Sequence, residues 1–184
     1  ILTVQWSNGN ASIIDNTDWN HDPNFIDPLK NPEIEAYTYC VSFEDDFIMV
    51  DNHRYLANVL VTDSVFLKLM DYPVISGIKS IQKPDDVIIT RKYVRHLFGD
   101  EDPLGKQLTS SVGTTLTIRG IIDEPSTKSS LSFDLIAPVD QGEYVSWSRM
   151  GFCIVRLTNG TDVTKYNEKI SKPQSLFCFG SSPI

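Results

Sequence analysis

The apolar residues of this chain lie in short runs, and this feature restricts its fold more than any other. The densest runs are Phe47–Val50, Val87–Ile89 and Ile118–Ile122, each about as long as one β-strand. A membrane-spanning helix needs about 20 consecutive apolar residues, and no run approaches that length. Turn signals such as Asn8-Gly9 and Asp102-Pro103 separate the runs. The pattern therefore predicts a soluble, strand-rich chain.

Length and composition allow a sizeable core. The chain has 184 residues, of which 41% are apolar and 22% are charged. These proportions are ordinary for a globular protein, and the length suits one domain or two small lobes that share a core. The chain starts at Ile1 without an initiator methionine or a signal segment, so we expect that it was trimmed from a larger precursor.

The charge of the chain narrows the choice of partners. Its formal net charge is −8 at pH 7. A strongly negative surface repels phosphate groups, so nucleic acid is not an expected partner. The same charge argues against docking on an anionic membrane through a basic patch.

Strand-like segments account for most of the apolar residues. An Asn-Gly pair predicts a hairpin near the start of the chain, and a three-stranded antiparallel meander follows, with turns at 44–46 and 51–53. A hairpin with its turn at Val112-Gly113 comes later, and Asp71–Gly77 is expected to be a loop. The expected strands are Ile1–Trp6, Ala11–Ile14, Ile34–Phe43, Phe47–Val50, Tyr55–Val61, Val87–Ile89, Lys106–Ser111, Thr114–Ile122, Phe133–Ala137, Gly151–Thr158 and Ser175–Phe179.

A few short helices are expected among these strands, which indicates the α+β class. Thr62 or Asp63 can cap a helix that ends near Met70, because their oxygens accept hydrogen bonds from free amides at a helix start. Thr90 caps a second helix, Arg91–Phe98, and Gly99 suits its C-terminal end. Thr161 or Asp162 caps a third helix, and a short one is predicted at Asn24–Lys30.

An ordered series of motifs between residues 66 and 137 carries a family resemblance. No single piece is specific, but the order and spacing of the set are. The pieces are Asp71-Tyr72-Pro73-Val74-Ile75-Ser76-Gly77, Val87-Ile88-Ile89-Thr90 leading to Leu97-Phe98-Gly99, Asp102-Pro103-Leu104-Gly105-Lys106, Leu116-Thr117-Ile118-Arg119-Gly120-Ile121-Ile122, and Asp123-Glu124-Pro125 with Ser129-Ser130-Leu131-Ser132-Phe133-Asp134. The series resembles the MacB-like periplasmic core domain of MacB, LolC/LolE and other FtsX-related permeases.

The resemblance implies an architecture of two lobes. A porter-like lobe would comprise residues 1–62 with 140–184, and a Sabre-like inserted lobe would comprise residues 63–139. We expect the inserted lobe to be self-contained, with Val94, Leu97, Phe98, Ile118 and Ile121 in its core. The ends of the chain, before residue 20 and after residue 172, match no motif of the family.

The resemblance also implies a function. The domain would lie on the periplasmic side of a bacterial inner membrane, anchored by transmembrane helices that are not in this chain. It would transmit ATP-driven conformational change to an exported substrate or a periplasmic partner. The implied partners are a second permease copy, a cytoplasmic ATPase subunit or domain, and a periplasmic adaptor or lipoprotein. No catalytic, cofactor-binding or metal-binding residues are implied, and no binding residues can be named.

The residues themselves favour no catalytic or metal site. His21, His53 and His96 are scattered, whereas a metal needs converging ligands. The acidic runs Asp45-Asp46, Asp85-Asp86 and 100–102 lack the spacing of a calcium loop and are expected at solvated turns. No nucleophile elbow, P-loop or dinucleotide-binding motif occurs.

Two further classes stay open. A stand-alone periplasmic binding module would explain the solubility and the acidity equally well, and a hydrolase would need a pocket that the sequence does not reveal. The three cysteines, Cys40, Cys153 and Cys178, are too few for a disulfide framework. We expect buried thiols, with one bridged pair as the alternative.

Overall fold

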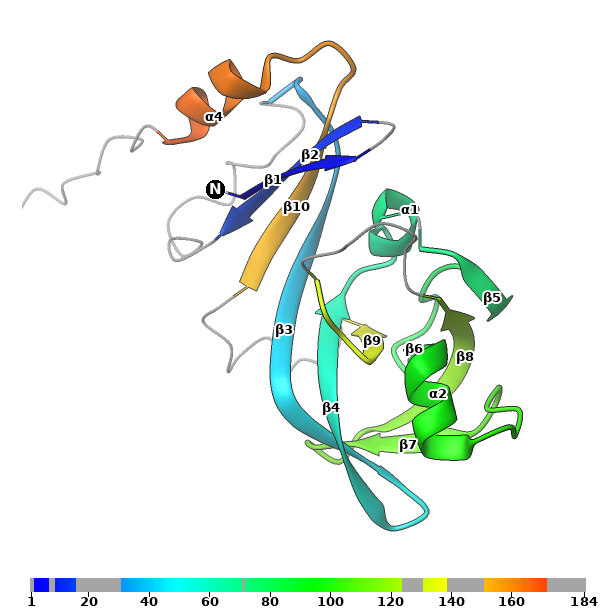
Figure 1. The fold of residues 1–184 in the computed structure, drawn as a ribbon. Coiled ribbons are helices and arrows are strands. Elements are labelled where there is room, and N and C mark those ends of the chain that lie inside the picture. Colours follow the sequence, from blue (N-terminus) through cyan, green and yellow to red (C-terminus); the bar gives the residue numbers. More distant parts are fainter. Residues whose placement is uncertain are drawn as a thin grey trace, which may run out of the picture.

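The computed structural model describes residues 2–6, 9–15, 31–70, 72–123, 131–138 and 151–171. Over these residues it contains one ten-stranded sheet and a few short helices (Figure 1), which confirms the expected α+β class. The predicted helix at 24–30 and the predicted strand at 175–179 lie outside the described residues. In chain order the elements are β1 (Leu2–Trp6), β2 (Gly9–Asp15), β3 (Ile34–Val50), β4 (His53–Thr62), α1 (Phe66–Met70), β5 (Val74–Gly77), β6 (Asp86–Thr90), α2 (Arg91–Phe98), β7 (Gln107–Ser110), β8 (Thr115–Ile122), β9 (Leu135–Pro138), β10 (Gly151–Leu157) and α4 (Val163–Ser171).

Six of the strands close into a ring. Around it, β3 pairs with β4, β4 with β9, β9 with β6, β6 with β8, β8 with β7, and β7 again with β3. The remaining strands extend the sheet outward: β10, β2 and β1 follow from the first half of β3, and β5 pairs with β8. The 17-residue strand β3 therefore belongs both to the ring and to the outer part of the sheet.

A hydrophobic core fills the ring. The strands β3, β4, β6, β7, β8 and β9 all contribute buried side chains to it, and α2 adds Tyr93 and Val94. The predicted core residues Val94 and Ile118 are buried, and Leu97, Phe98 and Ile121 pack against the same cluster while partly exposed. The inserted segment 63–139 is not self-contained, because β3 and β4 complete its core.

The predicted turn at Glu44–Asp46 is wrong, because β3 continues through it. The pairing of β3 with β4 shifts register between Phe43 and Asp46, so a bulge absorbs the extra residues. Asp45 adopts φ 55°, and its N–H donates to the side-chain oxygen of Asn58 at 3.2 Å. The chain reverses only at Asp51-Asn52, where both residues have positive φ, as a two-residue hairpin turn requires.

The predicted loop at Asp71–Gly77 is also partly wrong, because its second half is the strand β5. A close backbone approach explains why this strand ends in glycine. A Cβ on Gly77 would lie 2.0 Å from the carbonyl oxygen of Arg119, and one on Gly120 would lie 2.6 Å from that of Ile78. Both glycines therefore lie where the backbones of β5 and β8 come too close for a side chain.

The helix α2 has the predicted bounds and caps. The Thr90 hydroxyl accepts a hydrogen bond from the Tyr93 N–H at 3.3 Å. Gly99 has φ 61° and donates its N–H to the carbonyl of Arg95 at 3.1 Å. The helix packs Tyr93 and Val94 into the ring core and leaves Arg91 exposed.

Candidate functional site

The helix α1 lies where the chain leaves β4 and enters the inserted segment, so it is the candidate joint between the two parts. Asp63 caps the start of this helix. One carboxylate oxygen, Oδ1, accepts from the Val65 N–H at 2.8 Å and from the Thr38 hydroxyl at 2.8 Å. Thr38 is on β3, so the cap ties the joint to the strand that crosses the molecule.

Buried hydroxyl groups extend this contact across the β3–β4 pair. Thr38 and Thr62 are both fully buried, and their hydroxyl oxygens are 3.0 Å apart. The Thr62 hydroxyl donates to the carbonyl of Tyr39 at 2.7 Å. Because a buried polar group without a partner destabilises the fold, this network favours one arrangement of the strand ends.

Arg156 holds the other end of α1. Its guanidinium donates to the carbonyl oxygen of Leu69 and, at 3.5 Å, to that of Lys68. Carbonyl groups in the last turn of a helix have no partner within the helix, and a cation suits them. Arg156 is on β10, so the outer sheet contacts the joint directly.

Between these two ends, Phe66 anchors α1 in a second hydrophobic core. Its side chain is fully buried, and its ring centroid lies 5.8 Å from that of Tyr72 and 6.0 Å from that of Phe133. The cluster also contains Cys40 of β3 and Ile154 of β10. The joint is thus packed against the outer sheet as well as the ring.

A cleft of about 260 Å³ lies beside the joint. It opens between Asp63 and Ser64 at the start of α1 and the segment from Ile81 to Pro84. Asp86 holds the backbone of this segment in place. Its buried carboxylate accepts hydrogen bonds from the N–H groups of Gln82 at 3.0 Å and Lys83 at 2.9 Å. This member of the Asp85-Asp86 run is therefore a buried structural acceptor rather than a solvated turn residue.

The other acidic runs and the histidines also serve local structure. Asp46 accepts from the Ser111 hydroxyl at 2.9 Å, and Asp102 accepts from the Leu104 N–H at 3.0 Å. His96 lies between aromatic rings on α2, whereas His53 lies by the β3–β4 turn. Within the residues that the structure describes, no three His, Cys, Asp or Glu side chains could hold a metal ion together. His21 lies outside them.

The two described cysteines are buried and unbridged. They lie on the neighbouring strands β3 and β10, but Cys153 is opposite Tyr39 and Cys40 is opposite Phe152, so the two thiols face opposite sides of the sheet. Burial raises the pKa of each thiol to about 12. A disulfide between them is therefore absent, and Cys178 lies outside the described residues.

A known protein family matches most of this chain. The model of the MacB-like periplasmic core domain matches residues 1–172. The chain belongs to the MacB-like periplasmic core domain family. It is thus the periplasmic domain of a MacB/FtsX-type ABC transporter permease. No curated protein matches the chain.

Solved structures show the same fold. The periplasmic region of MacB from Actinobacillus actinomycetemcomitans is 14% identical, with a TM-score of 0.67 over 87% of this chain and 79% of that one. The extracellular domain of the noncanonic ABC-type transporter YknZ from Gram-positive bacteria is 14% identical, with a TM-score of 0.61 over 88% and 89%. A domain of a permease protein from Porphyromonas gingivalis is 21% identical, with a TM-score of 0.62 over 75% and 68%.

In this MacB-like domain, sequence reasoning located α1 and Asp63 but missed Thr38 and Arg156. Both are single polar residues within apolar strands and belong to no motif. A charged residue in an otherwise apolar run was the one available signal for Arg156. No helix in the described ranges is long and apolar enough to cross a membrane.

Proposed function

We propose that this domain is a non-catalytic lever of the permease. It would carry motion from the membrane helices, driven by ATP hydrolysis on a cytoplasmic subunit or domain, to an exported substrate or a periplasmic partner. Residues 1–62 with 140–184 would form the porter-like lobe and residues 63–139 the Sabre-like lobe. Two copies of the domain would move relative to each other in the intact transporter.

The joint at α1 is the observation that supports this proposal. Arg156 contacts one end of the helix, the Asp63–Thr38 pair holds the other, and Phe66 packs between them. β3 also continues as one strand, through its bulge, from the outer sheet into the ring. A displacement of one lobe is therefore passed to the other with little bending, which a lever requires.

Spin-label distances in the full permease, reconstituted in lipid nanodiscs, test this proposal. The exposed residue Lys92 on α2 is replaced with labelled cysteine, with Cys178 changed to serine. Double electron–electron resonance then measures the distance between the two copies, without nucleotide and with ATP plus vanadate. We expect ATP to shift this distance.

An intramolecular pair is the matched control. Labels at Lys92 and at Thr164 on α4, in a chain diluted with unlabelled copies, should keep one narrow distance in both states. Arg156→Gln should broaden that distance and reduce the shift between copies. Distances between copies that are the same with and without ATP would refute the lever. A change in the intramolecular distance as large as the change between copies would refute the stiffness of the domain.

A further inference from the structure

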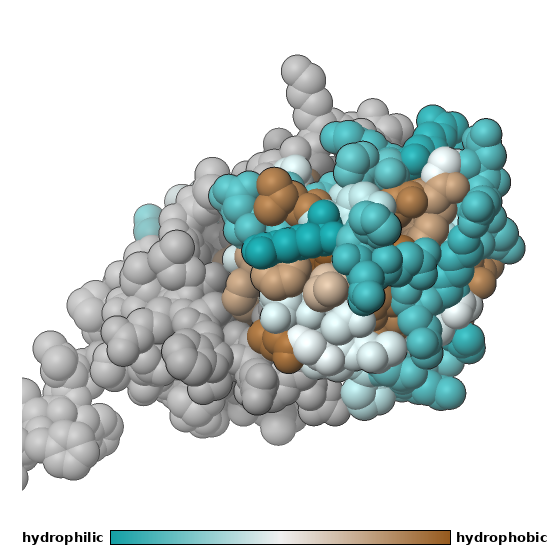
Figure 2. All heavy atoms as spheres, turned by 90° about the horizontal axis from the view of Figure 1, so that it is seen from below, coloured by the Kyte–Doolittle hydropathy of each residue, from teal (hydrophilic) through white to brown (hydrophobic). Residues whose placement is uncertain are grey.

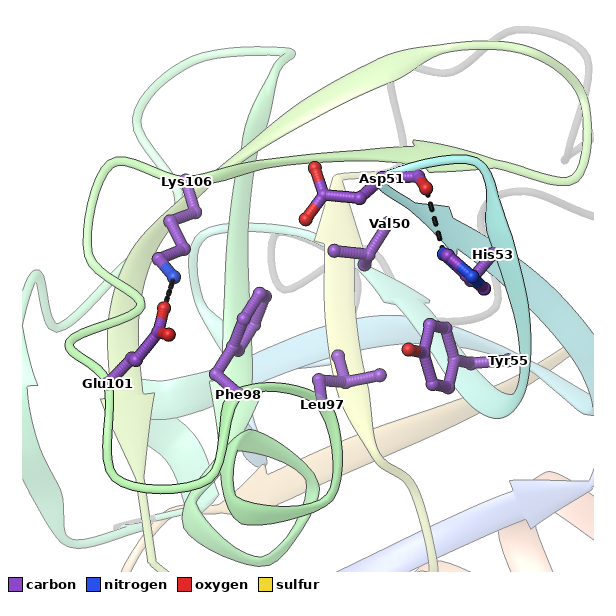
Figure 3. A pocket seen from close by; sticks show the side chains of 8 residues that line it. All are labelled: Val50, Asp51, His53, Tyr55, Leu97, Phe98, Glu101 and Lys106. Atoms are coloured by element: carbon purple, nitrogen blue, oxygen red, sulfur yellow. Dashed lines mark hydrogen bonds and ion pairs between the residues drawn. The ribbon is translucent and has the colours of Figure 1, made fainter.

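A second cavity of about 260 Å³ lies at the tip of the β3–β4 hairpin, where the hairpin meets the C-terminal end of α2 (Figure 3). Its apolar lining consists of Val50 from the end of β3 and of Leu97 and Phe98 from α2. His53 and Tyr55 of β4 also line it. The cavity therefore combines an apolar and aromatic surface with polar groups at its edge.

Carboxylates dominate the charge of this cavity. Asp51, Glu101 and Lys106 line it. Lys106 forms an ion pair with Glu101 and lies 4.8 Å from the centroid of the Phe98 ring, so one negative and one positive charge compensate each other. Asp51 forms no ion pair within the described part of the chain, and its side chain is exposed. The cavity thus retains one uncompensated negative charge beside aromatic rings.

Two of the polar residues that line the cavity, Asp51 and Glu101, carry carboxylates, which only accept hydrogen bonds. The backbone carbonyl of Asp51 accepts a hydrogen bond from Nδ1 of His53 at 2.9 Å, so this contact occupies the carbonyl and leaves the Asp51 carboxylate free of it. The Asp51 carboxylate favours a ligand that donates hydrogen bonds and carries positive charge. A guanidinium or ammonium on an apolar stem matches both features, because cations also bind aromatic faces.

The size and position of the cavity favour a side chain over a whole small molecule. Pockets for drug-sized ligands span roughly 300–1,000 Å³, and this cavity is smaller than that range. It lies at the end of the molecule opposite β1 and α4, the first and last described elements (Figure 1). Seen from this end, hydrophilic side chains lie next to apolar ones on the described surface (Figure 2). The net charge of −8 also attracts a basic protein surface.

We propose that this hairpin-tip cavity binds an arginine or lysine side chain of a polypeptide partner. The site is separate from the joint at α1, so the binding proposal can be wrong while the lever proposal is right. Binding through one exposed carboxylate and an aromatic wall is weak by itself. It serves as one contact of a larger interface.

Titration of the ¹⁵N-labelled chain, followed by NMR, tests the proposal. The probes are the peptide acetyl-Leu-Arg-Leu-amide, the same peptide with neutral citrulline in place of arginine, and butylguanidine. We expect the arginine peptide to shift the amide signals of residues 50–55 and 97–106, and the citrulline peptide to leave them unchanged. The shifts should weaken as salt increases.

Two aspartates of the same hairpin provide a matched pair of variants. Asp51 has φ 49° and Asp45 has φ 55°, and asparagine tolerates such angles well, so both variants should fold. Asp51→Asn should weaken peptide binding about fivefold, the effect of losing one exposed ion pair. Asp45→Asn removes the same charge outside the cavity and should change binding less than about twofold.

The results that overturn the proposal are distinct. Equal binding of the citrulline and arginine peptides would show that the cavity does not recognise the positive charge of the ligand. Equal losses in the two variants would show that only the net charge of the hairpin matters. Butylguanidine that binds as tightly as the arginine peptide would identify a free cation, rather than a polypeptide, as the ligand. Shifts confined to other residues would place the site elsewhere.

Discussion

Arg156 contributes to the structure through hydrogen bonds that its place in the sequence does not predict. It is the one charged residue in the run Phe152–Leu157, yet its guanidinium satisfies carbonyl groups at the end of α1. Hydrogen bonds of charged groups contribute more than neutral ones, and Arg156 is half-buried. A single side chain thus links the outer sheet to the joint.

We expect Arg156→Gln to lower the free energy of unfolding by about 1–2 kcal/mol, because it weakens these hydrogen bonds. Urea unfolding measures the loss, and hydrogen exchange should show faster opening of residues 67–70. Arg54→Gln is the control, because Arg54 lies over the Phe47 ring at an exposed site. Equal losses in the two variants would contradict the role given to Arg156.

The buried cysteines lead to a second expectation for single residues. Burial raises the pKa of Cys40 and of Cys153 from 9.0 to about 12, so both thiols stay protonated near neutral pH. Iodoacetamide at pH 8 should therefore modify neither residue in the folded protein and both after unfolding, as measured by peptide mass spectrometry. Rapid alkylation of the native protein would disprove the burial.

The same shifts set a pH dependence. A thiol whose pKa is higher in the folded state stabilises the fold fully below pH 9, its unfolded value. That contribution is lost as the pH rises toward 12. We expect the free energy of unfolding to fall across this alkaline range, and to fall less steeply in Cys40→Ala than in the unmodified chain. Identical slopes would count against this assignment.

Among the elements, those with strong local signals were predictable. The helix α2 follows from Thr90, its apolar stripe and Gly99, and the β7–β8 hairpin follows from alternation around Val112-Gly113. The continuity of β3 was not predictable, because three acidic residues in a row resemble a turn. The bulge that carries the strand through them is fixed by Asn58 on the neighbouring strand, a contact that the sequence does not display.

The joint shows the same division. Asp63 at a helix start is a local signal, but its bond to Thr38 joins residues that only the fold brings together. The same holds for Arg156 and α1. Propensity and spacing identify an element and its cap, whereas the partners of a single polar residue depend on the pairing of distant strands.

The packing of β8 and α2 supports a prediction at the element scale. Ile118 is fully buried in the ring core, whereas Leu97 is only partly buried at its edge. Ile118→Ala should cost about 2–5 kcal/mol, and Leu97→Ala clearly less, because the cost grows with the cavity left behind. Chemical denaturation of both variants measures the order. The reverse order would mean that α2, rather than β8, dominates the core.

Across the described parts of the molecule, no group of side chains that could bind a metal ion takes part in holding the fold together. The ring core and the second core around Phe66 are apolar, and several of the described acidic residues serve as helix caps, turn acceptors or partners in ion pairs. We therefore expect the same melting temperature with and without a chelator. A large drop on adding EDTA would reveal a structural ion.

The closed ring has a consequence for how the chain acquires its shape during synthesis. The hairpin of β3 and β4 is complete at Thr62, but its ring partner β9 is not complete until Pro138. At ordinary ribosomal rates of about 5–20 residues per second, the nascent hairpin waits several seconds with its apolar inner face uncovered. During this interval the exposed apolar face can aggregate with other chains, and it can also be bound by a chaperone.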